Sequence, residues 1–200
     1  MQIKIFGCKI YISLLFFTML ISILLLDKSG VILYGIMSVT LHEIGHLIAM
    51  LFVKCVPDEI ILQPAGIMIK RSSDFISLNK KLIIASAGCL MNMVLFIAFI
   101  FIYKLTGDEN ALLFAVANLS VCIFNLIFVS GLDGYDILIN ILSRLFTFDK
   151  ARIICKIISV ISVIILAVLS IYVFFIENGN ISIMIFTLYL TILTIMNLRC

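Results

Sequence analysis

Long apolar runs separated by short polar segments make up most of this chain. An apolar run of about 18 or more residues is long enough to cross a bilayer as a helix. Six runs approach or exceed this length, and each predicts a transmembrane helix. They are residues 10–26, 31–53, 82–103, 111–129, 157–176 and 181–198. The expected fold class is therefore an all-α polytopic membrane protein, with residues 1–200 forming a single domain.

The first run allows two interpretations. Residues 10–26 are 17 in number, and the apolar residues within 3–6 could lengthen the helix. A cleaved signal peptide is the alternative, but its apolar core is usually about 7–15 residues and is followed by a small-x-small cleavage site. No such site follows Leu26. A retained helix is the favoured interpretation.

The segment between the second and third runs differs from the rest. It contains both prolines of the chain, Pro57 and Pro64, and two β-prone pieces at 59–63 and 65–70. These pieces predict a short β-hairpin or a re-entrant segment. Its edge could pair with an extended substrate, or it could be a plain interfacial hairpin. A later run, 137–148, has 12 residues and is expected as an interfacial helix because it is too short to cross.

Composition and charge agree with a membrane protein. Apolar residues make up 64% of the chain and charged residues 12%, against about 25% charged in soluble domains. With six spans, all basic residues except Lys28 and Lys104 fall on one side of the membrane. Cytoplasmic segments are rich in lysine and arginine, so both termini are expected in the cytoplasm. The net charge of +3 requires no nucleic-acid partner.

The six cysteines are scattered, with no C-x-x-C pair. We interpret them as small apolar residues of helices rather than as a disulfide or zinc framework. They are Cys8, Cys55, Cys89, Cys122, Cys155 and Cys200.

Polar residues inside the second run carry the clearest chemical signal. His42, Glu43 and His46 lie within five positions, and the two histidines are the only ones in the chain. Ionisable groups inside a membrane are costly and usually mark a functional site. Residues four apart differ by about 40° around a helix and lie roughly 6 Å apart along it, so both imidazoles can reach one metal ion. The H-E-x-x-H pattern predicts two zinc ligands with Glu43 as general base, and Gly45 allows close approach of another helix.

A catalytic zinc site needs a third protein ligand and an open position for water. Both histidines are already used, so the ligand must be a cysteine or a carboxylate. Asp133 lies between Gly131 and Gly134, in a break after the fourth run. From spacing alone it is equally well a metal ligand or a turn aspartate. Asp136 is interpreted as a solvated neighbour.

These motifs together resemble the site-2 protease family of intramembrane zinc metalloproteases. Residues 42–46 match its H-E-x-x-H motif, residues 87–92 (AGCLMN) are similar to its A-G-P-x-x-N element, and residues 125–138 resemble its N-L-x-P-x-x-P-L-D-G-G-x-x-L stretch. The resemblance implies Zn²⁺ as cofactor and Asp133 as the third ligand. It also implies that Asn125 lies near the substrate or the oxyanion.

The sequence is also similar to the sporulation branch of this family, the stage IV sporulation protease of the FB type. Residues 60–66 and the FDKAR turn at 148–152 carry this likeness. It implies a substrate resembling a sigma-factor precursor, membrane inhibitor proteins as partners, and a location in the bacterial cell membrane or the outer forespore membrane. No CBS or PDZ domain is expected.

Several residues depart from the family pattern, and other functions remain open. Prolines of the family are replaced by Cys89, Phe128 and Gly131, while Tyr135 and Asp136 replace a glycine and the residue after it. One alternative is a stand-alone protease for peptide pheromones or leader peptides. Another is a catalytically inactive membrane adaptor. A metal carrier is disfavoured because the other runs lack repeated intramembrane ligands.

Overall fold

The structure is a computed structural model, and it forms two compact units, Met1–Ile123 and Phe124–Cys200. It describes residues 2–5, 8–12, 30–55, 59–63, 66–70, 77–176 and 182–198.

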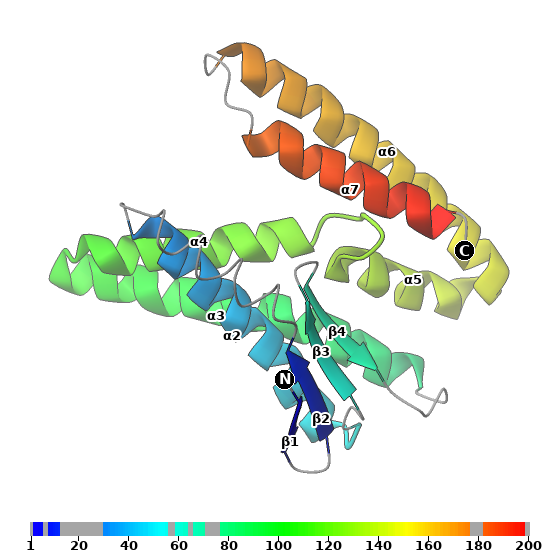
Figure 1. Cartoon of the computed structure of the whole chain (residues 1–200), viewed down its shortest axis with the longest axis horizontal. Coiled ribbons are helices and arrows are strands. Elements are labelled where there is room, and N and C mark those ends of the chain that lie inside the picture. The colour runs from blue at the N-terminus through cyan, green and yellow to red at the C-terminus, as the bar shows by residue number, and fades with distance from the viewer. Residues whose placement is uncertain are drawn as a thin grey trace. The chain divides into compact units, whose positions relative to one another are not determined.

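The helices of the first unit are α2 (Val31–Phe52), α3 (Leu78–Thr106) and most of α4 (Glu109–Asn125). In Figure 1, α3 and α4 run alongside each other and α2 crosses them. Gly107 ends α3 in the left-handed conformation (φ 70°), which glycine adopts without steric cost. Two residues later α4 begins, so α3 and α4 form a tight antiparallel pair.

Close contact between α2 and α3 depends on small residues. A Cβ added to Gly45 would lie 2.8 Å from the carbonyl oxygen of Ala87 and 3.2 Å from the Cα of Gly88. No larger side chain fits there without moving one helix. The helix approach predicted for Gly45 is therefore present, and its partner is α3.

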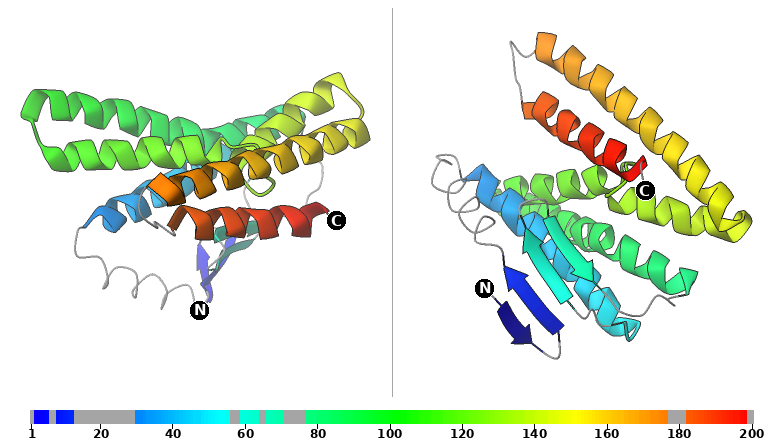
Figure 2. Two further views of the ribbon diagram at one scale, coloured as in Figure 1. Left: turned by 90° about the horizontal axis from the view of Figure 1, so that it is seen from above. Right: turned by 45° about the vertical axis from the view of Figure 1, so that its right-hand side comes forward.

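A four-stranded sheet also belongs to the first unit. Its strands are β1 (Gln2–Ile5), β2 (Cys8–Ile12), β3 (Glu59–Gln63) and β4 (Gly66–Lys70), in the order β1-β2-β3-β4. The β2–β3 pair is parallel and the other two pairs are antiparallel. Figure 2 shows the strands side by side. The hairpin expected between the second and third apolar runs is β3–β4, with Gln63 opposite Gly66.

The N-terminal part of the chain corrects the expected all-α fold. Residues 10–12 of the predicted first helix lie in β2, and residues 3–5, expected as an extension of that helix, lie in β1. The reason is local: isoleucines alternate with polar residues in QIKI, and in CKIYI the apolar Cys8, Ile10 and Ile12 alternate with Lys9 and Tyr11. This period of two fits a strand. The remainder of the run 10–26 lies outside the described residues.

The second unit contains α5 (Asp133–Leu145), α6 (Phe148–Ile176) and α7 (Ser182–Leu198). Figure 1 shows α6 and α7 packed side by side. Their core is formed by Val129, Val163 and Leu190. The interfacial helix expected at 137–148 corresponds to α5, which begins at Asp133 and ends at Leu145.

Helix lengths do not support the expected six spans. In the described part of the chain, three helices are long and apolar enough to cross a membrane: α2, α3 and α6. The helix predicted at 111–129 ends earlier, at Asn125, and α4 and α7 are shorter apolar helices of 17 residues. Large apolar side chains such as Phe52 (87% exposed) and Phe175 (77% exposed) lie on the surface. An exterior of this kind fits a lipid environment.

Candidate metal centre

The two histidines of α2 lie against each other in the interior of the first unit. His42 and His46 are 2% and 7% exposed, and their Nε2 atoms are 3.2 Å apart. Their rings meet edge to face, with centroids 4.8 Å apart. The helical spacing of four residues thus brings two ring nitrogens to one point, as the sequence predicts.

A carbonyl of α3 orients one of these rings. His46 Nδ1 lies 2.7 Å from the carbonyl oxygen of Ile84. A carbonyl can only accept, so Nδ1 carries the hydrogen and donates it. The neutral ring then presents the lone pair of Nε2 toward His42. Metal-binding histidines are commonly oriented by this kind of second hydrogen bond.

The distance between the two Nε2 atoms can be compared with the distance between two histidine nitrogens that bind the same zinc ion. Zinc binds histidine nitrogens at about 2.0–2.1 Å in tetrahedral geometry, which places two such nitrogens about 3.3 Å apart. The observed 3.2 Å matches this value. A buried imidazole pair with one ring fixed as the correct tautomer therefore fits a zinc ion.

Gly88 of α3 lies directly against both imidazoles. A Cβ at this position would lie 2.5 Å from His46 Nε2 and 2.7 Å from His42 Nε2. Only glycine leaves room for the two ring nitrogens and a ligand near them. The glycine of the AGCLMN segment thus has a steric role at this site, which sequence reasoning did not assign.

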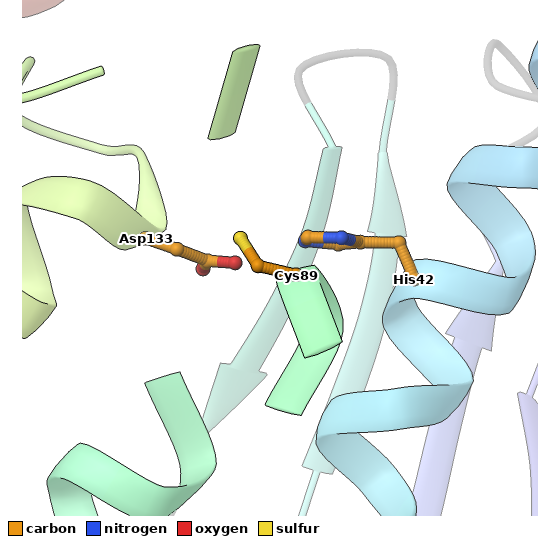
Figure 3. A group of neighbouring side chains, drawn as sticks. All are labelled: His42, Cys89 and Asp133. Carbon is orange, nitrogen blue, oxygen red and sulfur yellow. The ribbon is translucent and has the colours of Figure 1, made fainter. Parts of the chain in front are cut away.

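Cys89, the next residue, is buried beside the pair. Its ligand atom lies within 4.8 Å of a ligand nitrogen of His42. Figure 3 shows the His42 side chain extending from α2 toward Cys89 on α3. Cys89 and Cys122 also join α3 to α4, since each sulfur lies near the carbonyl oxygen of the other, at 3.9 and 3.5 Å. In the described part of the chain Cys55, Cys89, Cys122 and Cys155 form no disulfide.

Glu43 follows His42 on α2 and is half-buried. Consecutive helical residues are about 100° apart around the axis, so its carboxylate does not share the face of the two imidazoles. That position suits a group that contacts a metal-bound water rather than the metal itself.

The remaining two predicted site residues belong to the second unit. Asn125 is the last residue of α4, and Asp133, also drawn in Figure 3, is the first residue of α5; both are half-buried. The backbone between them is non-helical, as predicted. Gly131 makes the turn with φ at +98°, a conformation that favours glycine.

Two further contacts fix the start of α5. Ser130 N–H donates to Ser159 Oγ of α6 at 3.0 Å. A Cβ at Gly134 would collide with the carbonyl oxygen of Leu126, so the first turn of α5 packs directly on the backbone of the break. Burial raises the pKa of the Tyr135 phenol above its ordinary value.

Sequence reasoning missed a group of polar residues in the first unit. Ser38, Asn92 and Asn118 are fully buried. Ser38 Oγ, both amide atoms of Asn92 and Asn118 Oδ1 have no hydrogen-bond partner within the part of the chain that is described. Ser38 precedes His42 by one helical turn, and Asn92 follows Gly88 by one turn. Buried groups of this kind usually bind ordered water. These polar residues lie inside long apolar runs of the sequence, and that position could have indicated a functional role.

Comparison with known proteins identifies the architecture. Over 97% of its length the chain superimposes on 93% of the structure titled "Site-2 Protease from Methanocaldococcus jannaschii", with a TM-score of 0.69 and 23% sequence identity. The chain has a site-2 protease fold. No family model and no curated protein matches the sequence. The closer likeness to the sporulation branch stays a prediction.

Proposed function

We propose that this protein is an intramembrane metalloprotease. The observation that carries the proposal is the buried imidazole pair, with nitrogens 3.2 Å apart, on an apolar helix long enough to cross a membrane. The site-2 protease fold of the chain supports the same conclusion. A pair of histidines in this environment is costly unless it binds something.

The proposed metal is Zn²⁺, held by His42, His46 and Asp133. The two imidazoles have the tetrahedral separation described above. Asp133 matches the aspartate of the third family motif, and it stands at the start of a helix after a break that Gly131 makes possible. Two nitrogens and one carboxylate are a common donor set for catalytic zinc, and they leave one position open.

Bound zinc would acidify a water and polarise the scissile carbonyl. Glu43 accepts the proton of the attacking water at its carboxylate and delivers it to the nitrogen of the leaving amine. The Asn125 amide is proposed to donate a hydrogen bond to the carbonyl oxygen as it gains negative charge. His46, held by the Ile84 carbonyl, keeps its Nε2 lone pair available throughout.

The proposed substrate is a membrane-associated protein or peptide bound in an extended form, because a helix engages its own carbonyls. In the described residues β4 ends the sheet order, and its outer edge could accept an added strand. The sporulation-type motifs favour a substrate resembling a sigma-factor precursor, regulated by membrane inhibitor proteins. A peptide pheromone or leader peptide would be handled by the same chemistry.

Cleavage of a fluorescent casein and of a synthetic transmembrane peptide by the detergent-purified protein tests this proposal. The wild type is expected to cleave, and Glu43→Gln is expected to lose about 10²–10⁴-fold in kcat while staying folded. Glu109→Gln is the matched control, since Glu109 is an exposed glutamate at the start of α4. Equal cleavage by Glu43→Gln and wild type would refute the assigned base. No cleavage of either substrate, or of a sigma-factor-precursor fusion coexpressed with it, would favour the inactive adaptor.

A further inference from the structure

We propose that Cys89 is a fourth, thiolate ligand of the metal and closes the site at rest. This inference rests on the proposed metal centre. In the resembling family motif this position is a proline, which cannot bind a metal. Here a sulfur occupies it, next to the glycine that touches both imidazoles.

The position of the sulfur supports coordination. Gly88 holds the backbone of α3 against His42 and His46, so the following side chain starts beside the ring nitrogens. The Cys89 sulfur lies within 4.8 Å of the ligand nitrogen of His42. In a tetrahedral zinc site a thiolate and an imidazole nitrogen are about 3.6 Å apart. A rotation about χ1 of Cys89 is the movement by which the sulfur is proposed to reach this distance.

The Cys89 thiol donates a hydrogen bond to the carbonyl oxygen of Cys122 at 3.9 Å. This contact is long, and thiols are weak donors. Zinc binds thiolate strongly, so exchange of this contact for a metal bond is favourable. The thiol proton goes to solvent water when the metal binds.

A second residue of α3, Asn92, also indicates that a polar group binds near Cys89. Asn92 is three residues after Cys89 and 0% exposed. Neither its amide nitrogen nor its amide oxygen has a hydrogen-bond partner among the described residues. A buried amide in this state indicates that water or another polar group belongs beside it. A polar ligand or its bound water on this side of α3 would supply such a group.

The consequence is a regulated site. Zinc with two histidines, one aspartate and one thiolate has four protein ligands, which is the closed arrangement of structural sites. Hydrolysis requires an open position, so Cys89 must leave before water can bind. Removal of the sulfur should therefore weaken metal binding and raise the rate of cleavage.

Cobalt substitution tests the assignment directly. Detergent-purified wild-type protein loaded with Co²⁺ is expected to show the visible bands of four-coordinate cobalt and a near-ultraviolet sulfur-to-cobalt charge-transfer band. Cys89→Ala should lose the charge-transfer band and keep the visible bands, while its affinity for Co²⁺ falls about 10–100-fold. Cys122→Ala is the matched control and should keep both, because Cys122 is buried on the facing helix α4. Cys89→Ser replaces Cys89→Ala if the alanine variant does not fold.

Each other result refutes the proposal. Visible cobalt bands without a charge-transfer band in the wild type would show that no sulfur binds. An unchanged charge-transfer band in Cys89→Ala would assign the sulfur to another cysteine. Absence of bound cobalt would refute the whole metal centre, whereas the cleavage comparison of Glu43→Gln with wild type tests the protease separately.

Discussion

Gly88 has no Cβ, and this single missing atom leaves the space in which the two histidines can bind one ion. The ring nitrogens of His42 and His46 occupy the space that a Cβ at this position would need. Gly35 of α2 is a useful contrast, because a Cβ there would meet nothing within 4 Å. The same chemical change can thus be made at a critical and at a neutral glycine of the same unit.

Gly88→Ala should weaken zinc binding by at least about tenfold, because the added methyl group displaces the imidazoles from their shared point. Isothermal titration of the metal-free protein with Zn²⁺ measures this. Gly35→Ala should bind zinc as the wild type does and gain up to about 1 kcal/mol of helix stability. Equal zinc affinity in Gly88→Ala and Gly35→Ala would show that the approach of α3 does not control the site.

The histidine pair and Glu43 were predictable because helical spacing alone places them. Gly88 and Cys89 were not, since their role depends on which face of α3 meets α2. The sequence contains the A-G-x-x-x-N pattern, but it does not show that this part of α3 contacts the histidines of α2. Asp133 lies between these cases: its place at a helix start after a break agrees with the sequence, while its role as a ligand stays a prediction.

At the scale of elements, the break between α4 and α5 is held by contacts within the second unit. The N–H of Ser130 donates to Ser159 Oγ of α6, and Ser159 is 1% exposed. Gly131 turns the chain next to Leu193 of α7, whose Cδ2 would be 2.6 Å from an added Cβ. The start of α5, and with it Asp133, therefore depends on α6 and α7.

Ser159→Ala should destabilise the protein by about 1–3 kcal/mol, because it leaves the part-buried N–H of Ser130 without its acceptor. Ser170→Ala on the same helix is the matched control. Ser170 Oγ donates to the Ala167 carbonyl within α6 at 2.8 Å, so its loss should cost less than about 1 kcal/mol. Thermal unfolding in detergent compares the two, and equal shifts would contradict the role assigned to Ser159.

Element types were predictable where the period of the sequence is clear. The hairpin β3–β4 and the helices α2 and α3 lie where the sequence places them. The helix expected at 157–176 is present as α6, but it begins earlier, at Phe148, so the expected turn at 148–152 is its first part. The N-terminal strands were not predicted, because the period-two pattern of residues 2–12 leads directly into the long apolar run that ends at residue 26, and the two together were interpreted as one helix. A strand at β2 also needs a partner, β3, which lies far along the chain. Local sequence does not reveal such a pairing.

For the whole molecule, the sheet constrains the arrangement in the membrane. The N-terminal strands and the connection between α2 and α3 share one sheet, which predicts that they lie on the same side of the bilayer. The basic residues Lys4, Lys9 and Lys70 all belong to this sheet, and their charge predicts that the sheet lies in the cytoplasm. Lys104, in the last turn of α3, is expected on the opposite side.

Single cysteines test this arrangement in a background with all six native cysteines changed to serine. A membrane-impermeant thiol reagent added to intact cells should label Lys104→Cys but not Lys4→Cys or Lys70→Cys. Inverted vesicles should give the opposite pattern, because α3 separates Lys70 from Lys104. Different labelling of the Lys4 and Lys70 positions would contradict the shared sheet.

Zinc content of the detergent-purified protein tests the central claim most directly. The wild type should contain about one zinc per chain, and Glu43→Gln should retain it because Glu43 is the base and not a ligand. His46→Ala and Asp133→Ala should contain clearly less. Folded wild-type protein that binds no zinc when zinc is supplied, or His46→Ala that retains all of it, would contradict the account of this protein as a metalloprotease.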